Sequence, residues 1–326
     1  MDAPFTLPDL AFVRLRMTMR LLADARLPAH KGALFRGGFG YAFQRATCPE
    51  GCWGHARECA SETICPYRWV FETPHPPGIA QLHNLQDVPR PFALRLPRDQ
   101  RTSYRAGETL EFELVIIGRG LDYLPFFIFG FARLGEIGLG AGRSRARLER
   151  AEALEAWNPV GPVVYQDGRV VDLDTLPQID GAAILARAQA LPPDLRLSIE
   201  TPLQVKVGGA LIKQLELPAL IRATAWRLDA LATFHGGGPW QTNQRGLAEQ
   251  AQAVAVEQVQ VCWEEWERRS DHGAGPQKIQ MGGIVGSAVL RAVPVALRAV
   301  LLAGTVANVG KASVFGNGVL AVEALR

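Results

Sequence analysis

A lysine lies among glycines near the end of the chain, and this combination is suited to binding phosphate. Lys311 follows a glycine directly, and further glycines follow within a few residues. Glycine adopts positive φ and lets another backbone approach closely. The spacing differs from a Walker loop, which needs Gly-x4-Gly-Lys-Ser/Thr after a strand. Here an apolar, helix-like segment precedes the loop and a strand follows it, so the pattern indicates the backbone phosphates of a polymer. The other candidate residues are Gly310, Ser313, Gly316 and Gly318.

A second group with chemical potential is a cluster of cysteines with the spacing C-x3-C-x6-C-x5-C. Its members are Cys48, Cys52, Cys59 and Cys65. Four thiolates so close in sequence could ligate one zinc ion tetrahedrally, with His55 able to replace one of them. The cluster lacks a C-x2-C knuckle, and four cysteines also suit an iron–sulfur cluster. We therefore predict a structural zinc site, with an iron–sulfur cluster and unligated thiols as alternatives.

The composition is that of a soluble globular protein. The chain has 326 residues, which is enough for two domains with full cores, and 48% are hydrophobic. The net charge of +3 is by itself a weak indication of nucleic-acid binding. The N-terminus lacks the basic and apolar regions of a signal peptide, and the apolar region 284–309 is interrupted by Arg291, Pro294 and Arg298. We expect a cytoplasmic protein without a membrane span or a disulfide scaffold.

In the first half, the apolar pattern changes between periods of two and of about 3.6 residues. Strict alternation from Val13 to Leu22 predicts a half-buried strand with a basic outer face. In the segment 32–45, Phe35, Phe39 and Phe43 form one helical stripe, which we assign to the core. Further predictions are strands at 92–96 and 109–117, a helix at 124–134, a glycine-rich turn at 135–142, and a strand at 143–150 with Arg143, Arg145 and Arg147 on one face.

The second half repeats this order after a loose connection over 151–190 with weak strands near positions 163 and 170. Its predicted elements are strand 195–207, helix 217–234, strands 253–268 and 278–290, helix 295–305 and strand 318–322. The order strand, helix, strand, strand, helix, strand is the ferredoxin-like pattern. We predict an α+β protein of two tandem ferredoxin-like domains, 1–185 and 190–326. The first carries a cysteine-rich insertion at 46–91, and the second carries the glycine-rich loop.

Several stretches resemble the RAMP superfamily of CRISPR-associated proteins, and within it the endoribonuclease branch that processes precursor CRISPR RNA. They are Lys31–Gly40, the cysteines with Cys65–Tyr67, the glycine-rich turn up to Arg143, Trp263–Arg268 with Met281–Gly286, Val309–Lys311, and Phe315–Gly318. The resemblance extends over nearly the whole chain. Two places depart from the family pattern. Asn308 stands where histidine is common, and the stretch after Ser270 lacks an Arg-Gln pair.

The resemblance implies RNA cleavage without a catalytic metal, in which the 2′-hydroxyl attacks the neighbouring phosphate. A base takes the hydroxyl proton, an acid protonates the leaving 5′-oxygen, and a cation stabilises the charged intermediate. The expected products carry 5′-hydroxyl and 2′,3′-cyclic phosphate ends. Because family members place a catalytic histidine near the first helix, we assign His30 first, with Lys31 or Arg36 as the cation. His272 is the second candidate.

The expected partner is CRISPR repeat RNA or the mature CRISPR RNA, with other CRISPR effector subunits as further partners and no membrane. Lys311 and its loop would contact RNA phosphates, as would Arg143 and Arg145 of the first domain. One alternative is a RAMP subunit that binds guide RNA in an effector complex without cutting it, which the asparagine at 308 favours. A second alternative is a structural protein whose glycines only shape turns and whose partner is another protein.

Overall fold

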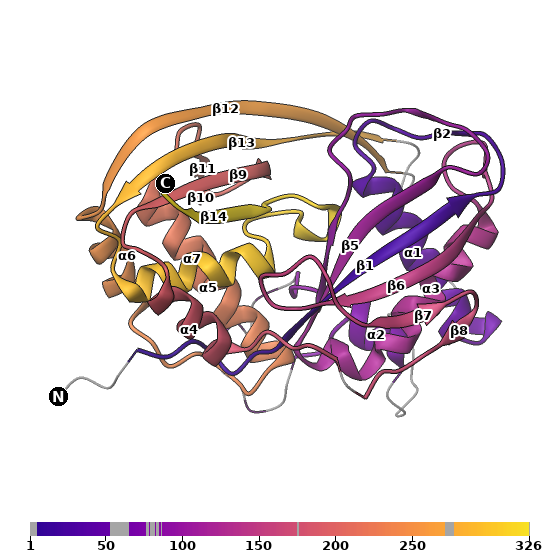
Figure 1. The fold of residues 1–326 in the computed structure, drawn as a ribbon, viewed down its shortest axis with the longest axis horizontal. Helices are drawn as coiled ribbons and strands as arrows, with labels where there is room; N and C mark the ends of the chain where they lie inside the picture. Colours follow the sequence, from indigo (N-terminus) through magenta and orange to yellow (C-terminus); the bar gives the residue numbers. More distant parts are fainter. Residues whose placement is uncertain are drawn as a thin grey trace. The chain divides into compact units, whose positions relative to one another are not determined.

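The computed structural model describes residues 5–52, 65–75, 78, 82, 85, 87–174, 176–270 and 277–325. The chain forms two compact units (Figure 1): an N-terminal unit, Ala11–Ile179, and a C-terminal unit, Asp180–Arg326 with the segment that ends at Leu10. The indole N–H of Trp240 donates to the carbonyl of Thr6 at 3.0 Å, which ties that first segment to the C-terminal unit. The domain limits of 1–185 and 190–326 stay a prediction.

The N-terminal unit is an antiparallel sheet with helices packed on it. Its sheet has the strand order β3-β5-β1-β6-β7-β8, and α1 packs on α3. The elements are β1 Phe12–Leu21, β2 Ala25–Arg26, α1 Gly32–Thr47, η1 Glu50–Cys52, α2 Pro66–Phe71, β3 Phe92–Arg95, β4 Ser103–Tyr104, β5 Thr109–Ile117, η3 Gly118–Tyr123, α3 Leu124–Ile137, β6 Ala146–Leu154, β7 Val163–Gln166 and β8 Arg169–Val170.

The core of this unit is an aromatic cluster between α1, α3 and the sheet. The predicted helical stripe is confirmed as core, because Phe35, Phe39 and Phe43 are fully buried. Phe39 stacks on Phe131 of α3 with ring centroids 4.2 Å apart. One of the α1 glycines has a packing reason: a Cβ on Gly38 would lie 2.6 Å from a side-chain carbon of Leu134. Close helix packing thus explains a glycine that weakens the isolated helix.

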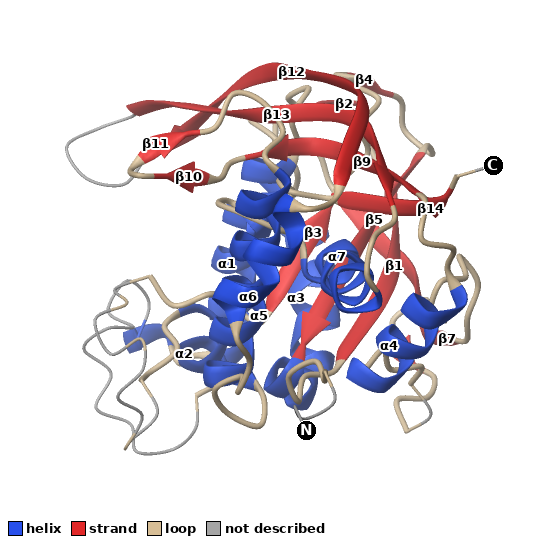
Figure 2. Cartoon of the chain, turned by 90° about the vertical axis from the view of Figure 1, so that its left-hand side faces the viewer, coloured by secondary structure: helices blue, strands red, loops and turns tan. Residues whose placement is uncertain are grey.

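The C-terminal unit has a four-stranded antiparallel sheet in the order β12-β13-β9-β14. Its helices α4, α5, α6 and α7 lie on one face of that sheet (Figures 1 and 2). The elements are α4 Gly181–Ala190, β9 Leu195–Leu203, β10 Lys206–Val207, β11 Ala210–Leu211, α5 Leu217–His235, α6 Gln244–Gln252, β12 Ala255–Ser270, β13 Gln277–Arg291, α7 Val295–Ala307, η4 Ser313–Phe315 and β14 Leu320–Ala324.

The glycines of β13 serve strand packing. Gly283 faces the backbone of Leu203 on β9, where a Cβ would lie 2.6 Å from its atoms. Gly286 has φ +133°, and a Cβ there would overlap the carbonyl oxygen of Gln260 on β12. The β13–β9 register shifts at this point. The Gly-Gly-x-x-Gly stretch is therefore a bulge site within the sheet, as expected where backbones approach closely.

Most predicted strands and helices agree with the structure to within a few residues, but several features differ. Strand β6 begins at Ala146, so Arg143 and Arg145 lie in the preceding loop and the predicted strand face with Arg147 is wrong. The antiparallel bridge between Leu139 and Ser144 closes a turn there. The helices α2, α4 and α6 were not predicted from the sequence. In α4 and α6 the N-cap side chains, Asp180 and Asn243, accept main-chain hydrogen bonds.

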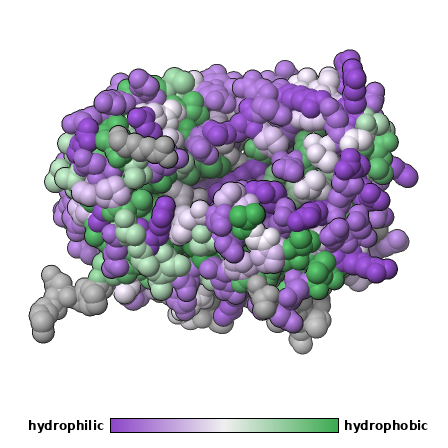
Figure 3. All heavy atoms as spheres, viewed as in Figure 1, coloured by the Kyte–Doolittle hydropathy of each residue, from purple (hydrophilic) through white to green (hydrophobic). Residues whose placement is uncertain are grey.

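Both units are mixed α+β structures with the element order strand, helix, strand, strand, helix, strand. In the N-terminal unit these elements are β1, α1, β3, β5, α3 and β6, and in the C-terminal unit β9, α5, β12, β13, α7 and β14. On the face shown in Figure 3, hydrophilic residues surround small groups of hydrophobic ones. Among the described residues, none of the helices has both the length and the apolarity needed to span a bilayer.

Candidate functional site

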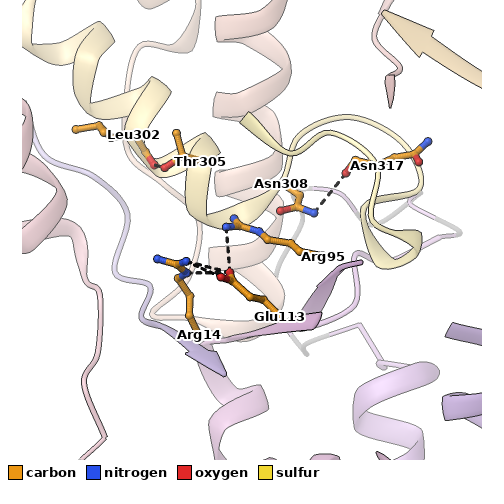
Figure 4. A network of polar contacts seen from close by, with 7 residues as sticks. All are labelled: Arg14, Arg95, Glu113, Leu302, Thr305, Asn308 and Asn317. Carbon is orange, nitrogen blue, oxygen red and sulfur yellow. Dashed lines mark hydrogen bonds and ion pairs between the residues drawn. The ribbon is translucent and has the colours of Figure 1, made fainter. Parts of the chain in front are cut away.

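The glycine-rich loop between α7 and β14 is closed at its neck by main-chain hydrogen bonds. The amide of Val309 donates to the carbonyl of Gly318 at 2.8 Å, and the amide of Lys311 donates to Gln204 at 3.2 Å. The side-chain amide of Asn308 also donates to the carbonyl of Asn317 at 3.4 Å (Figure 4). These contacts fix the two ends of the loop against each other and against β9.

The predicted phosphate-binding residues of this loop divide into two roles. Gly310, Gly316 and Gly318 have φ of +79°, +94° and +72°, and so provide backbone conformations that other residues rarely adopt. Ser313 is buried. Lys311 has an exposed side chain. The loop therefore presents an exposed cation, Lys311, on a backbone shaped by glycine, which is an arrangement able to contact a phosphate.

The candidate catalytic residues near α1 have different surroundings. His30 is half-buried just before the helix. The Lys31 side chain is completely buried, and its ammonium pairs with Asp99 at 3.0 Å. Burial opposes ionisation of Asp99, but hydrogen bonds from Lys31 and the Arg101 amide outweigh it and lower the pKa of that carboxyl. The Lys31 ammonium is therefore already engaged in an ion pair within the protein.

Arg36, the other candidate cation, lies on α1 with its side chain half-buried. Its guanidinium carbon is 5.2 Å from the centroid of the Phe71 ring, within the range of a cation–π contact. His272 lies outside the described residues, so its surroundings add nothing to its assignment. Of the two cations proposed beside His30, the half-buried Arg36 is thus better placed than Lys31 to reach a substrate.

Arg143 and Arg145 are exposed on the loop before β6. Arg143 has φ +46°, and the amide of Leu22 donates to the carbonyl of Arg145 at 2.8 Å, so the loop is anchored to the end of β1. Within the described part of the chain, neither arginine forms a salt bridge. Both cations are available to solvent and to an anionic ligand.

A basic cluster on the sheet of the N-terminal unit was only partly foreseen. Arg14 of β1 binds Glu113 of β5 through two guanidinium nitrogens, the closest contact being 2.9 Å (Figure 4). Arg95 of β3 lies 3.6 Å from the same carboxylate. Two arginines therefore share one glutamate. Alternation along β1 places Arg14 on the outer face, but only strand pairing brings Arg95 beside it.

The cysteine cluster is described in part, because Cys59 and His55 lie outside the described residues. The sulfurs of Cys48 and Cys65 are 3.6 Å apart. Tetrahedral zinc with zinc–sulfur bonds of about 2.3 Å separates its sulfurs by about 3.8 Å, so this pair fits two ligand positions. Burial, together with the nearby thiols of Cys65 and Cys52, raises the pKa of Cys48 to about 11. Among the described residues alone, no group of three metal-binding side chains is assembled.

The two units match two protein-family models. A family described as the AF_1859_N N-terminal domain matches residues 8–176. A family described as CRISPR-associated endoribonuclease Cas6 matches residues 197–320. The chain thus belongs to the AF_1859_N N-terminal domain family and carries a Cas6 domain in its second half, which confirms its recognition as a CRISPR-associated protein of the RAMP endoribonuclease branch.

Individual relatives are distant. An uncharacterized protein of Archaeoglobus fulgidus is 26% identical over 215 residues, which cover 65% of this chain and 66% of the relative. A chain of a partial Cas6-RT-Cas1–Cas2 complex has a TM-score of 0.59 at 15% identity, over 98% of this chain and 46% of that one. A Cas6 product complex has a TM-score of 0.53 at 15% identity, over 96% and 100%. At this identity the structural matches establish the fold.

Proposed function

We propose that this protein cleaves the repeat of precursor CRISPR RNA without a catalytic metal. The match of residues 197–320 to the Cas6 endoribonuclease family carries this proposal. The exposed Lys311 on its glycine-shaped loop supports it, because such a loop suits a polymer phosphate. The element order of each unit supports two tandem ferredoxin-like domains. In keeping with a soluble RNA-processing protein, we place it in the cytoplasm.

In the proposed reaction, His30 takes the proton of the 2′-hydroxyl or gives one to the leaving 5′-oxygen. Imidazole suits either step because its pKa lies near neutrality. Arg36 stabilises the negative charge that develops on the phosphate. The 2′-oxygen forms a bond to phosphorus as the bond to the 5′-oxygen breaks. The products therefore carry a 2′,3′-cyclic phosphate and a 5′-hydroxyl.

One observation favours a second function, that of a RAMP subunit that holds guide RNA and does not cut it. Asn308 stands where the family resemblance leads us to expect histidine, and its side chain is completely buried. An amide cannot transfer protons as imidazole does. In this case the protein binds repeat RNA with the same loop and acts alongside other CRISPR effector subunits.

The deciding experiment is cleavage of end-labelled repeat RNA from the host CRISPR array in EDTA. Wild type, His30→Ala and His272→Ala are compared, with His75→Ala as a histidine control. A single cut that is lost in His30→Ala and retained in His75→Ala establishes the enzyme and its leading residue. Loss in His272→Ala alone moves the catalytic site to the C-terminal unit. If every sample binds the RNA tightly and none of them cuts it, the second function is established.

A further inference from the structure

Arg227, in the middle of α5, is a buried arginine without a carboxylate partner among the described residues. It is 6% exposed, and its Nε donates to the carbonyl of Ala307 at 3.0 Å. Its Nη2 is also buried and has no hydrogen-bond partner within the described part of the chain. Burial lowers the pKa of its guanidinium to about 10, so it is still cationic at neutral pH. A buried cation with so few partners costs stability, which suggests that this one has a use beyond packing.

The carbonyl that accepts the Arg227 hydrogen bond lies at the end of a helix. Ala307 is the last residue of α7. The final carbonyls of a helix have no partner within it, and the partial negative charge at that end attracts a cation. One helical turn earlier, Gly304 faces Thr224, where a Cβ would lie 3.1 Å from the Thr224 methyl. This close approach of α5 and α7 brings the Arg227 guanidinium within reach of the end of α7.

The end of α7 is also the beginning of the glycine-rich loop. Asn308 follows Ala307 directly, with φ +53° and a fully buried side chain that reaches the Asn317 carbonyl. Val309 then pairs with Gly318. The Arg227 guanidinium therefore binds Ala307, the residue at which α7 ends and the neck of the loop begins. A shift of that carbonyl would be transmitted to both sides of the neck.

We propose that Arg227 is a positioning residue, which fixes the end of α7 so that the glycine-rich loop presents Lys311 to an RNA phosphate. The inference rests on the proposed binding of repeat RNA by this loop. Arg227 itself is buried and does not touch the RNA. Its effect on binding is exerted through the loop and therefore depends on Lys311.

The test compares Arg227→Met with wild type for repeat-RNA affinity across a salt series and for thermal unfolding. Methionine fills a similar volume without charge, and replacing a buried ion by an apolar side chain is often neutral for stability. We expect an unchanged or higher melting temperature and about tenfold weaker RNA binding. We also expect the slope of log K against log salt to fall by about 0.7, the value for one lost phosphate contact on a single strand.

Arg298 provides a matched control. It lies on α7 of the same unit, is 8% exposed, and donates to the carbonyl of Leu191 at the end of α4, which does not lead into the loop. Its Nε is likewise buried and has no hydrogen-bond partner in the residues that the structure describes. Arg298→Met therefore removes a comparable buried guanidinium, and we expect it to leave RNA affinity and the salt slope unchanged.

A double-variant cycle separates positioning from general damage. If Arg227 acts through Lys311, Arg227→Met combined with Lys311→Met binds RNA no more weakly than Lys311→Met alone. Additive losses, or unchanged binding by Arg227→Met, would overturn the inference while leaving the proposed function intact. Absence of RNA binding by the wild type would refute the proposed function and this inference with it. If Arg227→Met does not fold, the neutral variant Arg227→Gln replaces it in the same cycle, with the same outcomes.

Discussion

Gly318 lies so close to Val309 that a Cβ on the glycine would overlap the carbonyl oxygen of that valine. Gly318 also has φ +72°, which is unfavourable for any residue with a side chain. We predict that Gly318→Ala destabilises the protein by more than the conformational cost alone, which is about 1–3 kcal/mol. Urea unfolding of the two proteins measures this difference.

The matched control is Gly209→Ala in the same unit. Gly209 has φ +87°, and a Cβ there would meet no atom within 4 Å. This variant carries only the conformational cost, so the excess loss in Gly318→Ala measures the overlap at the neck of the loop. Equal losses for the two alanine variants would contradict the close packing of Gly318 on Val309.

The buried pair of Lys31 and Asp99 predicts that removing either partner has unequal effects. Asp99→Asn leaves the completely buried ammonium of Lys31 without its counter-ion. Lys31→Met removes the buried charge and leaves Asp99, which is half-exposed, to be solvated by water. We expect the free energy of unfolding to fall by about 1–3 kcal/mol in Asp99→Asn and by less in Lys31→Met. Denaturant unfolding at pH 7 measures the free energy of unfolding of both variants. A larger decrease in Lys31→Met than in Asp99→Asn would contradict the buried ion pair of Lys31 and Asp99.

The same pair predicts a dependence of stability on pH. The folded-state pKa of Asp99 is lowered, because the hydrogen bonds from Lys31 and the Arg101 amide outweigh the opposing effect of burial. A lowered pKa gives stability that is complete above the unfolded value of about 3.9 and is lost as the pH falls through the folded value. We expect Asp99→Asn to lose less stability than wild type between pH 5 and pH 2, about the window of that titration. If the stability of wild type and of Asp99→Asn depended on pH in the same way, Asp99 would not be the source of this pH dependence.

The two exposed arginines on the loop before β6 predict a contribution to RNA affinity that depends on salt. If Arg143 and Arg145 each contact one phosphate, replacing both by glutamine lowers the salt slope by about 1.4 on single-stranded RNA. Arg147 on β6 is the control, because it pairs with Glu149 at 3.0 Å. We expect Arg147→Gln to change the slope less. An unchanged slope in the double variant would remove both residues from the RNA-binding surface.

The separation of the Cys48 and Cys65 sulfurs predicts bound metal in protein purified without oxygen. We expect about one zinc ion per chain by elemental analysis, and loss of zinc in Cys48→Ser or Cys65→Ser. Cys262 is exposed on β12 in the C-terminal unit, so Cys262→Ser should retain the metal. Iron with acid-labile sulfide in place of zinc would identify a cluster. Protein that contains neither metal would exclude both.

The sequence could name candidate catalytic residues but could not show which of their side chains are buried, because residue type alone does not indicate burial. Lys31, adjacent to His30, has the chemistry of a phosphate-binding cation, but its ammonium forms an ion pair with Asp99, which is far away in the sequence. The helix stripe of phenylalanines was predictable, since a period of 3.6 residues directly indicates a buried face. Arg143 lies in a turn and not in the predicted strand, because of the bridge between Leu139 and Ser144, which the local sequence pattern does not predict.

By itself the sequence determined the order of strands and helices, the core face of α1, and the glycine-rich loop with Lys311, because these follow from local periodicity and from backbone conformations that glycine permits. Tertiary structure alone decided which polar groups meet. Arg95 joins Arg14 on Glu113 through strand pairing, and Arg227 reaches Ala307 because α5 and α7 pack closely. Such contacts join residues far apart in sequence, and their geometry exists only once the chain has packed.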